Sequence, residues 1–558
     1  MTKIYSLKIS NFRGIKKFDQ VFGDSDFICI IGRGDSGKTT ILDAISCVLS
    51  PSWNLSFLDT DFYDCDVEQQ IEIEASVYDF PKILMREDKY GLYIRGLHQQ
   101  ENAIYDEIED DHVALITIRL CVGKDLEPTW HVVNNRQDPI EIKAKDRANL
   151  NVFLISDYID KHFSWNYGAP LYSLLRQEEN WQDAQEKNIL IEALREAKVK
   201  VDDSSFNHLD NVTEKIRKNA LELGIDIGDV STTIDFRDFL IKDSKVCLHK
   251  GKIPFRLKGK GSKRIISIAI QIELAKAGGI ILIDEIEHGL EPDRVQHLAK
   301  TLRENNSGQI FLTTHSRDVL VELEAQNLFL MQQEAGQLKK LNDDLQGCIR
   351  SNPEAFFAKN ILVCEGATEV GICRALNDDR IQKKKENATF KGVRFVDGHG
   401  SELINYARKF KEVGYNTCLF CDSDVDNVNS KKNELSELGI KIVHCASGKS
   451  IEMQIFNDLP WCGIQELISY YIKDSDTSLE AITQSIKSSM PNLPETWQDS
   501  DSQDVRDQLG IISSKKGWFK RIDHGIFLGG ICCKYLDEIK GTDLWKQFDQ
   551  LSEWIDNV

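Results

Sequence analysis

The chain has 558 residues, with 89 acidic and 69 basic side chains and a formal net charge of −20 at pH 7. A chain of this length is too long for one hydrophobic core, so we expect about two to four domains. Its 41% hydrophobic and 28% charged residues are typical of globular proteins and exclude a disordered or collagen-like chain. The negative charge also excludes sequence-blind wrapping of nucleic acid, so any such contact requires local basic patches.

Hydropathy and cysteine usage indicate the cellular compartment. No run approaches the roughly 18 apolar residues of a membrane span, and Met1–Tyr5 leads directly into a strand pattern rather than a signal region. The 14 cysteines have no repeating spacing, which is typical of reduced core thiols. Cys418 and Cys421 have the spacing of half a zinc site, but no second pair follows, so we interpret them as core residues. We therefore expect a cytoplasmic protein without disulfides or membrane contact.

The first predicted elements are a strand, a glycine-rich loop and a helix. Residues 4–9 alternate as a half-buried strand does, and residues 27–31 form a second strand pattern. The loop at 32–40 follows, and residues 41–49 have the apolar spacing of a helix. Several period-2 stretches between 65 and 155 predict an antiparallel, β-rich lobe.

The later part of the chain contains an insertion and a domain boundary. Residues 170–225 are charged and favour helix, and we expect them to serve dimer contacts. Strand and helix patterns return near 245, and Ser351–Pro353 marks a boundary before a new apolar strand. The predicted division is into a first domain with two parts at 1–165 and 246–352, a helical insert at 166–245, and a second domain at 353–558.

The loop at 32–40 has the spacing of a P-loop, Gly32-x4-Gly37-Lys38-Thr39. In such a loop the backbone N–H groups face phosphate oxygens, the lysine neutralises β- and γ-phosphate charge, and the threonine hydroxyl coordinates Mg²⁺. Because a strand precedes the loop and a helix follows it, we predict an ATP site. Its predicted residues are Gly32, Gly34, Asp35, Ser36, Gly37, Lys38, Thr39 and Thr40.

Two later strand patterns end in polar groups that suit the same site. The apolar run 279–283 ends in Asp284 and Glu285, and doubly wound sheets bind ligands at the carboxyl ends of their strands. We expect Asp284 to hold the Mg²⁺ and Glu285 to polarise the attacking water. Another run, 309–314, ends in His315, which could sense the γ-phosphate, although a lone histidine is more often structural.

The second domain places acidic residues after parallel strands. Strand patterns alternate with helical ones, and Glu365, Glu369, Asp422 and Asp424 fall at strand ends or directly after them. Because these carboxylates converge on one edge, they would repel one another unless divalent cations bound among them. Mg²⁺ or Mn²⁺ is the natural occupant, and such a centre suits phosphodiester cleavage.

Lys38, Asp284, Glu285 and His315, with the opening strand, resemble the ABC-type heads of SMC, RecF and OLD proteins over roughly residues 1–350. In these heads two copies enclose ATP, and each contributes a signature loop to the other. The resemblance therefore implies ATP binding and a homodimer or higher oligomer.

The signature region departs from the family pattern. At Lys258–Arg264, Gly259 replaces the usual serine, while Gly261 and Ser262 remain as helix N-terminal donors. Gly289–Pro292 resembles the D-loop of such dimers and is equally compatible with a helix-breaking turn. Nucleotide binding is thus implied more firmly than trans-activated hydrolysis.

The acidic residues of the second domain resemble those of a Toprim domain, and its union with an ABC head is similar to the OLD (overcoming lysogenisation defect) family. The resemblance implies that Glu365 and Glu369 bind one metal ion and that Asp422 and Asp424 bind the other. It also implies that three further acids lie near the site or add a ligand: Asp397, Asp426 and Glu452.

OLD-like nucleases also carry a late lysine that offsets charge developing on the phosphate. The basic cluster at 513–521 contains the candidates, of which Lys516 is favoured and Lys520 is the alternative. Trp518 and Phe519 within this cluster could stack on a base, and the alternative is a solvated loop.

We therefore expect an α/β protein, with an ABC-type ATPase head that has a β-rich lobe and a helical dimerisation insert, followed by a Rossmann-like Toprim domain. The resemblance implies an ATP-regulated, Mg²⁺-dependent endonuclease that cleaves DNA in anti-phage defence. Proteins of this family act alone, beside a helicase as in Gabija, or beside a retron reverse transcriptase with its RNA–DNA product, and the sequence does not choose among these settings. Two alternatives stay open: a RecF- or SMC-like repair ATPase that does not cut, and a toxin that cleaves RNA or nucleotides.

Overall fold

The computed structural model describes residues 2–157, 159–163, 169–175, 192–193, 195–200, 203, 207–222, 228, 248–276, 278–304, 308–332, 336–424 and 426–558. Most of the predicted helical insert therefore lies outside the described residues. The chain forms two compact units: the first comprises residues 1–27, 39–291 and 305–312, and the second comprises 28–38, 292–304 and 313–558.

The first unit contains an eight-stranded sheet whose described pairings are antiparallel. In β4 the isoleucines are buried while Glu72 and Glu74 are half-buried, so the alternation places one face on the core. This sheet is the predicted β-rich lobe. Its strands are β1 (Lys3–Phe12), β2 (Ile15–Val21), β4 (Ile71–Tyr78), β5 (Arg95–His98), β6 (Ala103–Tyr105), β7 (Val113–Val122), β8 (Pro128–Val133) and β9 (Ile140–Glu141).

The first unit also contains parallel strands in the order β10-β13-β14. Every side chain of β13 is buried, as expected of a strand that is covered on both faces. The elements are β10 (Val152–Ile155), β13 (Ile280–Ile283), β14 (Gln309–Thr313), α1 (Lys38–Val48), α2 (Ala144–Arg147), α3 (Pro170–Leu175), α5 (Asn207–Glu222), α6 (Lys260–Lys276), β11 (His249–Lys250) and β12 (Ile253–Pro254).

The second unit begins with the P-loop strand. β3 (Phe27–Ile31) pairs in parallel with β15 (Leu328–Leu330), which pairs with β16 (Lys339–Lys340). The helices that accompany these strands are α7 (Pro292–Glu304), α8 (Arg317–Leu320) and α9 (Gln346–Ser351).

A four-stranded parallel sheet, in the order β18-β17-β19-β20, forms the centre of residues 353–558. Its strands are β17 (Asn360–Cys364), β18 (Val393–Asp397), β19 (Asn416–Cys421) and β20 (Lys441–His444). All five residues of β17 are buried, so this strand carries Glu365 at the end of a fixed segment. The parallel sheet confirms the predicted α/β class.

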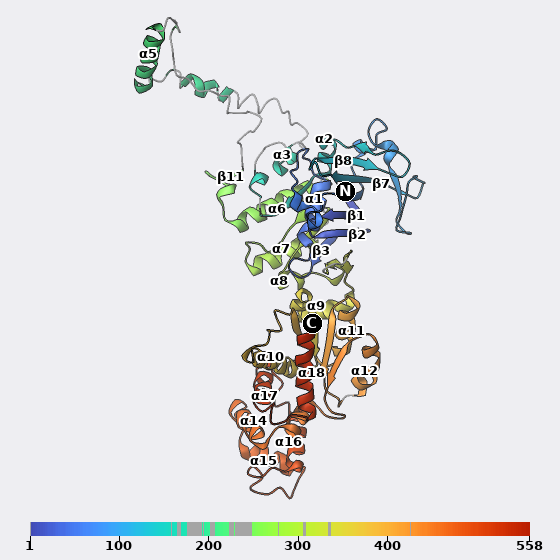
Figure 1. Cartoon of the computed structure of the whole chain (residues 1–558), viewed down its shortest axis with the longest axis vertical. Coiled ribbons are helices and arrows are strands. Elements are labelled where there is room, and N and C mark those ends of the chain that lie inside the picture. Colours follow the sequence, from blue (N-terminus) through green and yellow to red (C-terminus); the bar gives the residue numbers. More distant parts are fainter. Residues whose placement is uncertain are drawn as a thin grey trace. The chain divides into compact units, whose positions relative to one another are not determined.

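Helices surround this sheet. The C-terminal α18, drawn in red in Figure 1, buries Leu544, Phe548, Leu551 and Ile555 at helical spacing and contacts β20, α10 and α13. The helices are α10 (Ala367–Gln382), α11 (Leu403–Glu412), α12 (Asp426–Glu437), α13 (Ile451–Asp458), α14 (Trp461–Asp474), α15 (Leu479–Lys487), α16 (Gln503–Lys516), α17 (Ile522–Lys534) and α18 (Asp543–Asn557). Among the described residues, no helix is both long and apolar enough to cross a membrane.

Candidate nucleotide and metal centres

The P-loop has the backbone conformation that its glycines permit. Gly32 has a φ of 146°, and a Cβ there would lie 2.4 Å from the Met331 carbonyl oxygen. Gly37 has a φ of 96°. The ammonium of Lys38 donates to the carbonyl oxygens of Gly32 at 3.1 Å and Arg33 at 2.7 Å. The lysine thus points into the loop that would receive the phosphates.

The two predicted magnesium ligands of the nucleotide site meet directly. Thr39 Oγ1 donates to Asp284 Oδ1 at 3.1 Å, although the residues are 245 positions apart. Arg264 of α6, which is 3% exposed, donates to the backbone carbonyl of Asp284. The end of β13 is therefore fixed beside the start of α1, as a magnesium site for ATP requires.

The remaining residues of the predicted nucleotide site have varied surroundings. Glu285 is exposed and has a positive φ of 47°, and His315 is exposed after β14. At the signature region, a Cβ on Gly261 would lie 2.4 Å from the Gly289 carbonyl oxygen. The start of α6 therefore packs closely against the turn that resembles a D-loop.

The acidic centre is built around one contact between neighbouring strands. Glu365 follows β17 and Asp422 follows β19, and the backbone N–H of Asp422 donates to Glu365 Oε2 at 2.8 Å. Asp422 Oδ1 in turn accepts the backbone N–H of Ile451 at 2.8 Å. The carboxyl ends of β17 and β19 thus bring together two of the predicted metal ligands.

Two further carboxyl groups lie in this centre and are buried. Glu369, in the first turn of α10, is 4% exposed, and its Oε2 accepts the N–H of Gly366 at 2.8 Å. Glu452, in the first turn of α13, is fully buried. Burial, followed by the charge of Glu452, raises the pKa of Glu369 well above its ordinary value. Burial, followed by the charge of Glu369, raises the pKa of Asp422 in the same way.

The other predicted acids are less enclosed. Asp424 is exposed, and its charge is among the smaller causes that raise the pKa of Glu365, after burial. Asp397 ends β18 in register with Cys364, and its Oδ1 accepts the N–H of His399 at 2.8 Å. Asp426 opens α12, and its side chain lies outside the described residues.

The late lysine in the acidic centre is Lys520, the alternative candidate. Lys520 Nζ lies 3.2 Å from Glu452 Oε1. Burial lowers the pKa of Lys520, but the carboxylates of Glu452, Glu369 and Asp422 together raise it, and the net shift is upward. The favoured candidate, Lys516, instead donates to Ser485 Oγ at 2.6 Å at the end of α16.

The predicted stacking role of the neighbouring aromatic residues is wrong. Trp518 is 3% exposed and Phe519 is fully buried, so neither ring can accept a base. Trp518 stacks on Tyr471 with ring centroids 4.3 Å apart. The two rings belong to the core because Gly517, with a φ of 63°, ends α16 and turns the chain inward. Cys418 and Cys421 are likewise buried in β19, in agreement with the interpretation as core residues.

The donor set of the acidic centre fits hard divalent cations. Glu452 is fully buried, and the ammonium of Lys520, 3.2 Å from its Oε1, is the charged partner that the structure gives it. In the described part of the chain, three ligand atoms lie within 4.8 Å of one another only in the separate group Glu109, Asp111 and His112. Carboxylate oxygens are the ligands that Mg²⁺ and Mn²⁺ prefer, so Glu365, Glu369, Asp422 and Glu452 would be the residues to hold such ions.

Comparisons with known proteins identify both halves of the chain. A family model described as an AAA domain (AAA_21), whose description also names the AbiEii toxin of a type IV toxin–antitoxin system, matches residues 27–322. The Toprim domain model of overcoming lysogenization defect protein-like proteins matches residues 356–424. No curated protein matches the chain.

Solved structures of low overall similarity include ATPase heads. An Smc head domain from Pyrococcus furiosus, bound to the C-terminal domain of ScpA, is 15% identical, with 61% of this chain and 96% of that chain covered and a TM-score of 0.35. The recombination mediator RecF-ATPrS is 16% identical, with 61% and 98% covered and a TM-score of 0.31. The two family matches carry the assignment: the chain belongs to the AAA_21 ATPase family and joins this ATPase to an OLD-like Toprim domain, as OLD-family proteins do.

Proposed function

We propose that the protein is an ATP-regulated, metal-dependent endonuclease that cleaves DNA phosphodiester bonds at its Toprim centre. The observation that carries this proposal is the contact between Glu365 Oε2 and the Asp422 N–H at 2.8 Å, with Glu369 and Glu452 buried beside it. Buried carboxylates of this number are unfavourable by themselves and favourable around divalent cations.

In hydrolysis, different residues of the chain would bind the metal ions and compensate the charge on the phosphate. Glu365, Glu369, Asp422 and Asp424 would hold Mg²⁺ or Mn²⁺, with Glu452 as a further ligand. When bound, the ions supply an activated water and stabilise the leaving oxygen. Lys520, rather than Lys516, is in position to offset negative charge on the phosphate, because its ammonium lies beside Glu452.

The ATPase centre would regulate cleavage rather than drive it. The hydrogen bond from Thr39 to Asp284 supports magnesium-dependent ATP binding. By resemblance to the OLD family we propose a homodimer or higher oligomer that acts in anti-phage defence, with a helicase or a reverse transcriptase as partner.

The proposal is tested by a cleavage assay with purified protein and Mg²⁺ or Mn²⁺. Plasmid DNA, single-stranded DNA, RNA and free nucleotides are presented in parallel, with and without ATP. We expect DNA cleavage that Glu365→Gln or Asp422→Asn reduces by about 100-fold or more, since each ~1.4 kcal/mol lost from the transition state is tenfold in rate. Glu386→Gln, which changes a carboxylate that is 71% exposed, should leave cleavage unchanged.

The same assay separates the alternatives. Metal-dependent loss of RNA or nucleotides without loss of DNA would establish the toxin. Absence of cleavage of every substrate would leave the RecF- or SMC-like ATPase as the better account.

A further inference from the structure

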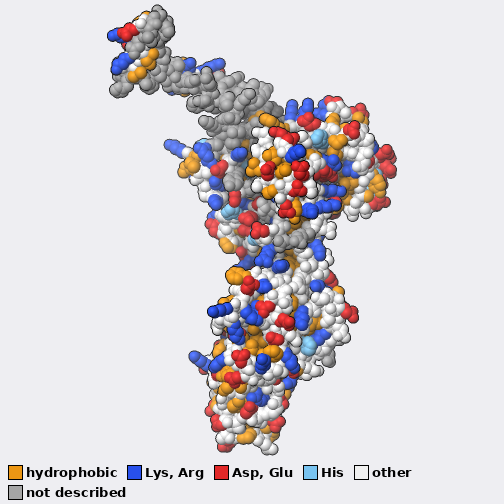
Figure 2. Space-filling view, in the orientation of Figure 1, with side chains coloured by type: hydrophobic (Ala, Val, Ile, Leu, Met, Phe, Trp, Pro, Cys, Tyr) orange, Lys and Arg blue, Asp and Glu red, His pale blue; other side chains and the backbone are white. Residues whose placement is uncertain are grey.

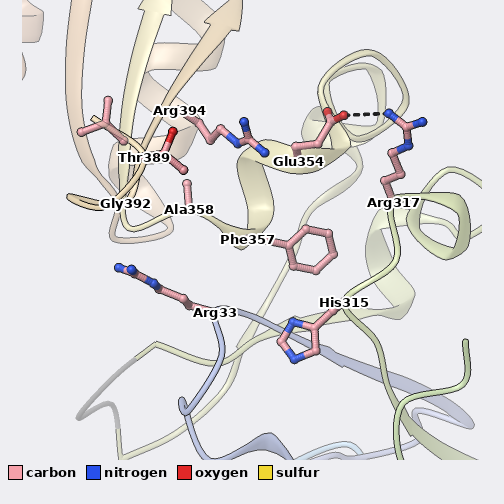
Figure 3. Close-up of a pocket in the computed structure, with 10 residues that line it drawn as sticks. Arg33, His315, Arg317, Glu354, Phe357, Ala358, Thr389, Gly392 and Arg394 are labelled. Atoms are coloured by element: carbon pink, nitrogen blue, oxygen red, sulfur yellow. Dashed lines mark hydrogen bonds and ion pairs between the residues drawn. The ribbon is translucent and has the colours of Figure 1, made fainter. Parts of the chain in front are cut away.

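A pocket of about 350 Å³ in the second unit combines P-loop and Toprim residues. Figure 3 shows Arg33 of the P-loop, His315 and Arg317 after β14, Phe357, and Gly392 and Arg394 at the start of β18 around this space. Its volume lies within the range of about 300–1,000 Å³ typical of ligand sites.

The charge of the pocket is positive in a chain that is strongly negative. Arg317 Nη1 lies 3.2 Å from Glu354 Oε1, so one guanidinium is already paired. The guanidinium groups of Arg33 and Arg394 have no hydrogen-bond or ionic partner among the described residues. On the face shown in Figure 2, acidic and basic side chains are interspersed. Guanidinium groups without a partner are the donors that bind phosphate and carboxylate groups, so Arg33 and Arg394 make the pocket a candidate anion site.

The pocket is held open by a fixed turn. The N–H of Gly392 donates to Thr389 at 2.9 Å, and its carbonyl oxygen accepts the N–H groups of Lys359 at 2.9 Å and Asn360 at 3.0 Å. Gly392 has a φ of 70°, and a Cβ there would lie 2.6 Å from Arg33 Nη1. The absence of a side chain at Gly392 therefore makes room for the Arg33 guanidinium.

Two phenylalanine residues accompany the arginine residues of the pocket. Phe357 lines it and is half-buried, with its ring centroid 6.1 Å from that of His315. Phe390 follows the lining residue Thr389 in the chain and is 81% exposed. Exposed aromatic rings together with arginine side chains are typical of surfaces that bind single-stranded nucleic acid, because bases stack on the ring while phosphates bind the guanidinium groups.

We propose that this pocket binds a single-stranded segment of nucleic acid, with phosphates at Arg33 and Arg394 and a base on Phe390. The pocket lies at the start of β18, whereas Glu365 and Asp422 follow the carboxyl ends of β17 and β19, so the inference goes beyond the proposed function and assigns a second contact to nucleic acid. A free nucleotide is the weaker candidate, because small-molecule sites bury about 70–90% of the ligand. Arg33, Arg394 and Phe390 are all exposed, so a small ligand held by them would stay open to solvent.

The test measures binding separately from cleavage. A fluorescent single-stranded oligonucleotide, in DNA and RNA forms, is titrated with full-length Glu365→Gln protein in EDTA over a salt series. We expect Arg394→Ala to weaken binding by about 5- to 10-fold and to reduce the log–log salt slope by about 0.7, the value of one phosphate contact. Phe390→Ala, a change of an exposed side chain that the fold tolerates, should weaken binding by about 5-fold or more through lost stacking.

The matched control is Arg408→Ala on α11, which removes a guanidinium that pairs with Glu434 of α12 and should leave binding unchanged. The inference is overturned if Arg394→Ala and Phe390→Ala bind the oligonucleotides as tightly as the control. It is also overturned if ATP or dTMP binding, and not oligonucleotide binding, depends on Arg394. Failure of the proposed function is a different result: wild-type protein would bind the strand in an Arg394-dependent way and cut nothing in Mg²⁺ or Mn²⁺.

Discussion

The side chains of Glu369 and Glu452 lie in residues that are 4% and 0% exposed, and within the described part of the chain only the ammonium of Lys520 forms an ion pair with either of them. Burial of charge without a matching partner costs several kcal/mol, and a protein usually avoids this cost by protonation or by binding a cation. The upward shift of the Glu369 pKa favours protonation of this carboxyl group. Bound divalent ions would compensate the charge of the ionised group instead.

At this scale we predict that Mg²⁺ or Mn²⁺ raises the melting temperature of the wild-type protein by a few degrees. Binding to the native state alone stabilises by about 2.7 kcal/mol at a ligand concentration of 100 times Kd. Glu369→Gln should abolish the increase, because the amide can still accept the Gly366 N–H but cannot hold the ion. Thermal unfolding with and without EDTA checks this, and an equal increase in Glu369→Gln and in Glu386→Gln would contradict it.

The choice between Lys516 and Lys520 shows what residue patterns leave undecided. Both lysines lie in the basic cluster at 513–521, four positions apart, so their spacing in the sequence does not choose between them. The left-handed conformation of Gly517 ends α16 between them and sends Trp518 and Phe519 into the core. Lys520 then emerges beside Glu452, while Lys516 stays on the helix near Ser485.

Among the elements, α10 and α17 pack closely beside the acidic centre. A Cβ on Gly371 would lie 2.3 Å from the Ile522 carbonyl oxygen, and a Cβ on Gly525 would lie 2.2 Å from the Thr368 carbonyl oxygen. Thr368 Oγ1 also donates to the Phe519 carbonyl at 2.6 Å. Because Glu369 follows Thr368 on α10, these contacts fix the backbone of a candidate metal ligand.

At the scale of elements we predict that Gly525→Ala destabilises the protein by about 1–3 kcal/mol, the cost of inserting a methyl group into a packed contact. The change should also reduce Toprim cleavage, since α10 must move away from α17. Gly530→Ala is the matched control in the same helix: nothing lies within 4 Å of its Cβ position. It should be neutral or stabilising by about 0.5–1 kcal/mol. Urea unfolding measures both, and equal effects of the two changes would contradict the close packing.

In the whole molecule, two phosphate-directed centres occupy one chain of net charge −20. One depends on Lys38 with Thr39 and Asp284, and the other on the acids of residues 365–452. The two sets of residues have no member in common, so we expect each centre to bind its own ligand without the other being occupied.

At the scale of the molecule we predict that Lys38→Ala weakens binding of a fluorescent ATP analogue by about 10- to 100-fold, because a hydrogen bond to a charged group contributes about 1.5–3 kcal/mol. The Mg²⁺-dependent increase in melting temperature without ATP should persist in this variant. Lys16→Ala, which changes an exposed lysine of β2, serves as control. Loss of the Mg²⁺ response in Lys38→Ala would show that the centres are not independent.

Residue patterns alone were enough to predict the P-loop, the carboxylates after β13, the parallel alternation of residues 360–444 and the acids that follow β17 and β19. These are local patterns: strand and helix periodicity places a residue at a strand end, and parallel strands end at the same edge of a sheet. The contacts from Thr39 to Asp284 and from Asp422 to Glu365 agree with that inference.

Other features could be seen only in the folded chain. These are the position of Lys520 beside the acids, the burial of Trp518, Phe519 and Glu452, and the place of Arg33 and Arg394 in one pocket. Each of these depends on how segments distant in the chain pack together. Such packing depends on side-chain volume and on backbone turns such as those at Gly392 and Gly517. The local periodicity of a sequence therefore does not predict which distant segments come into contact.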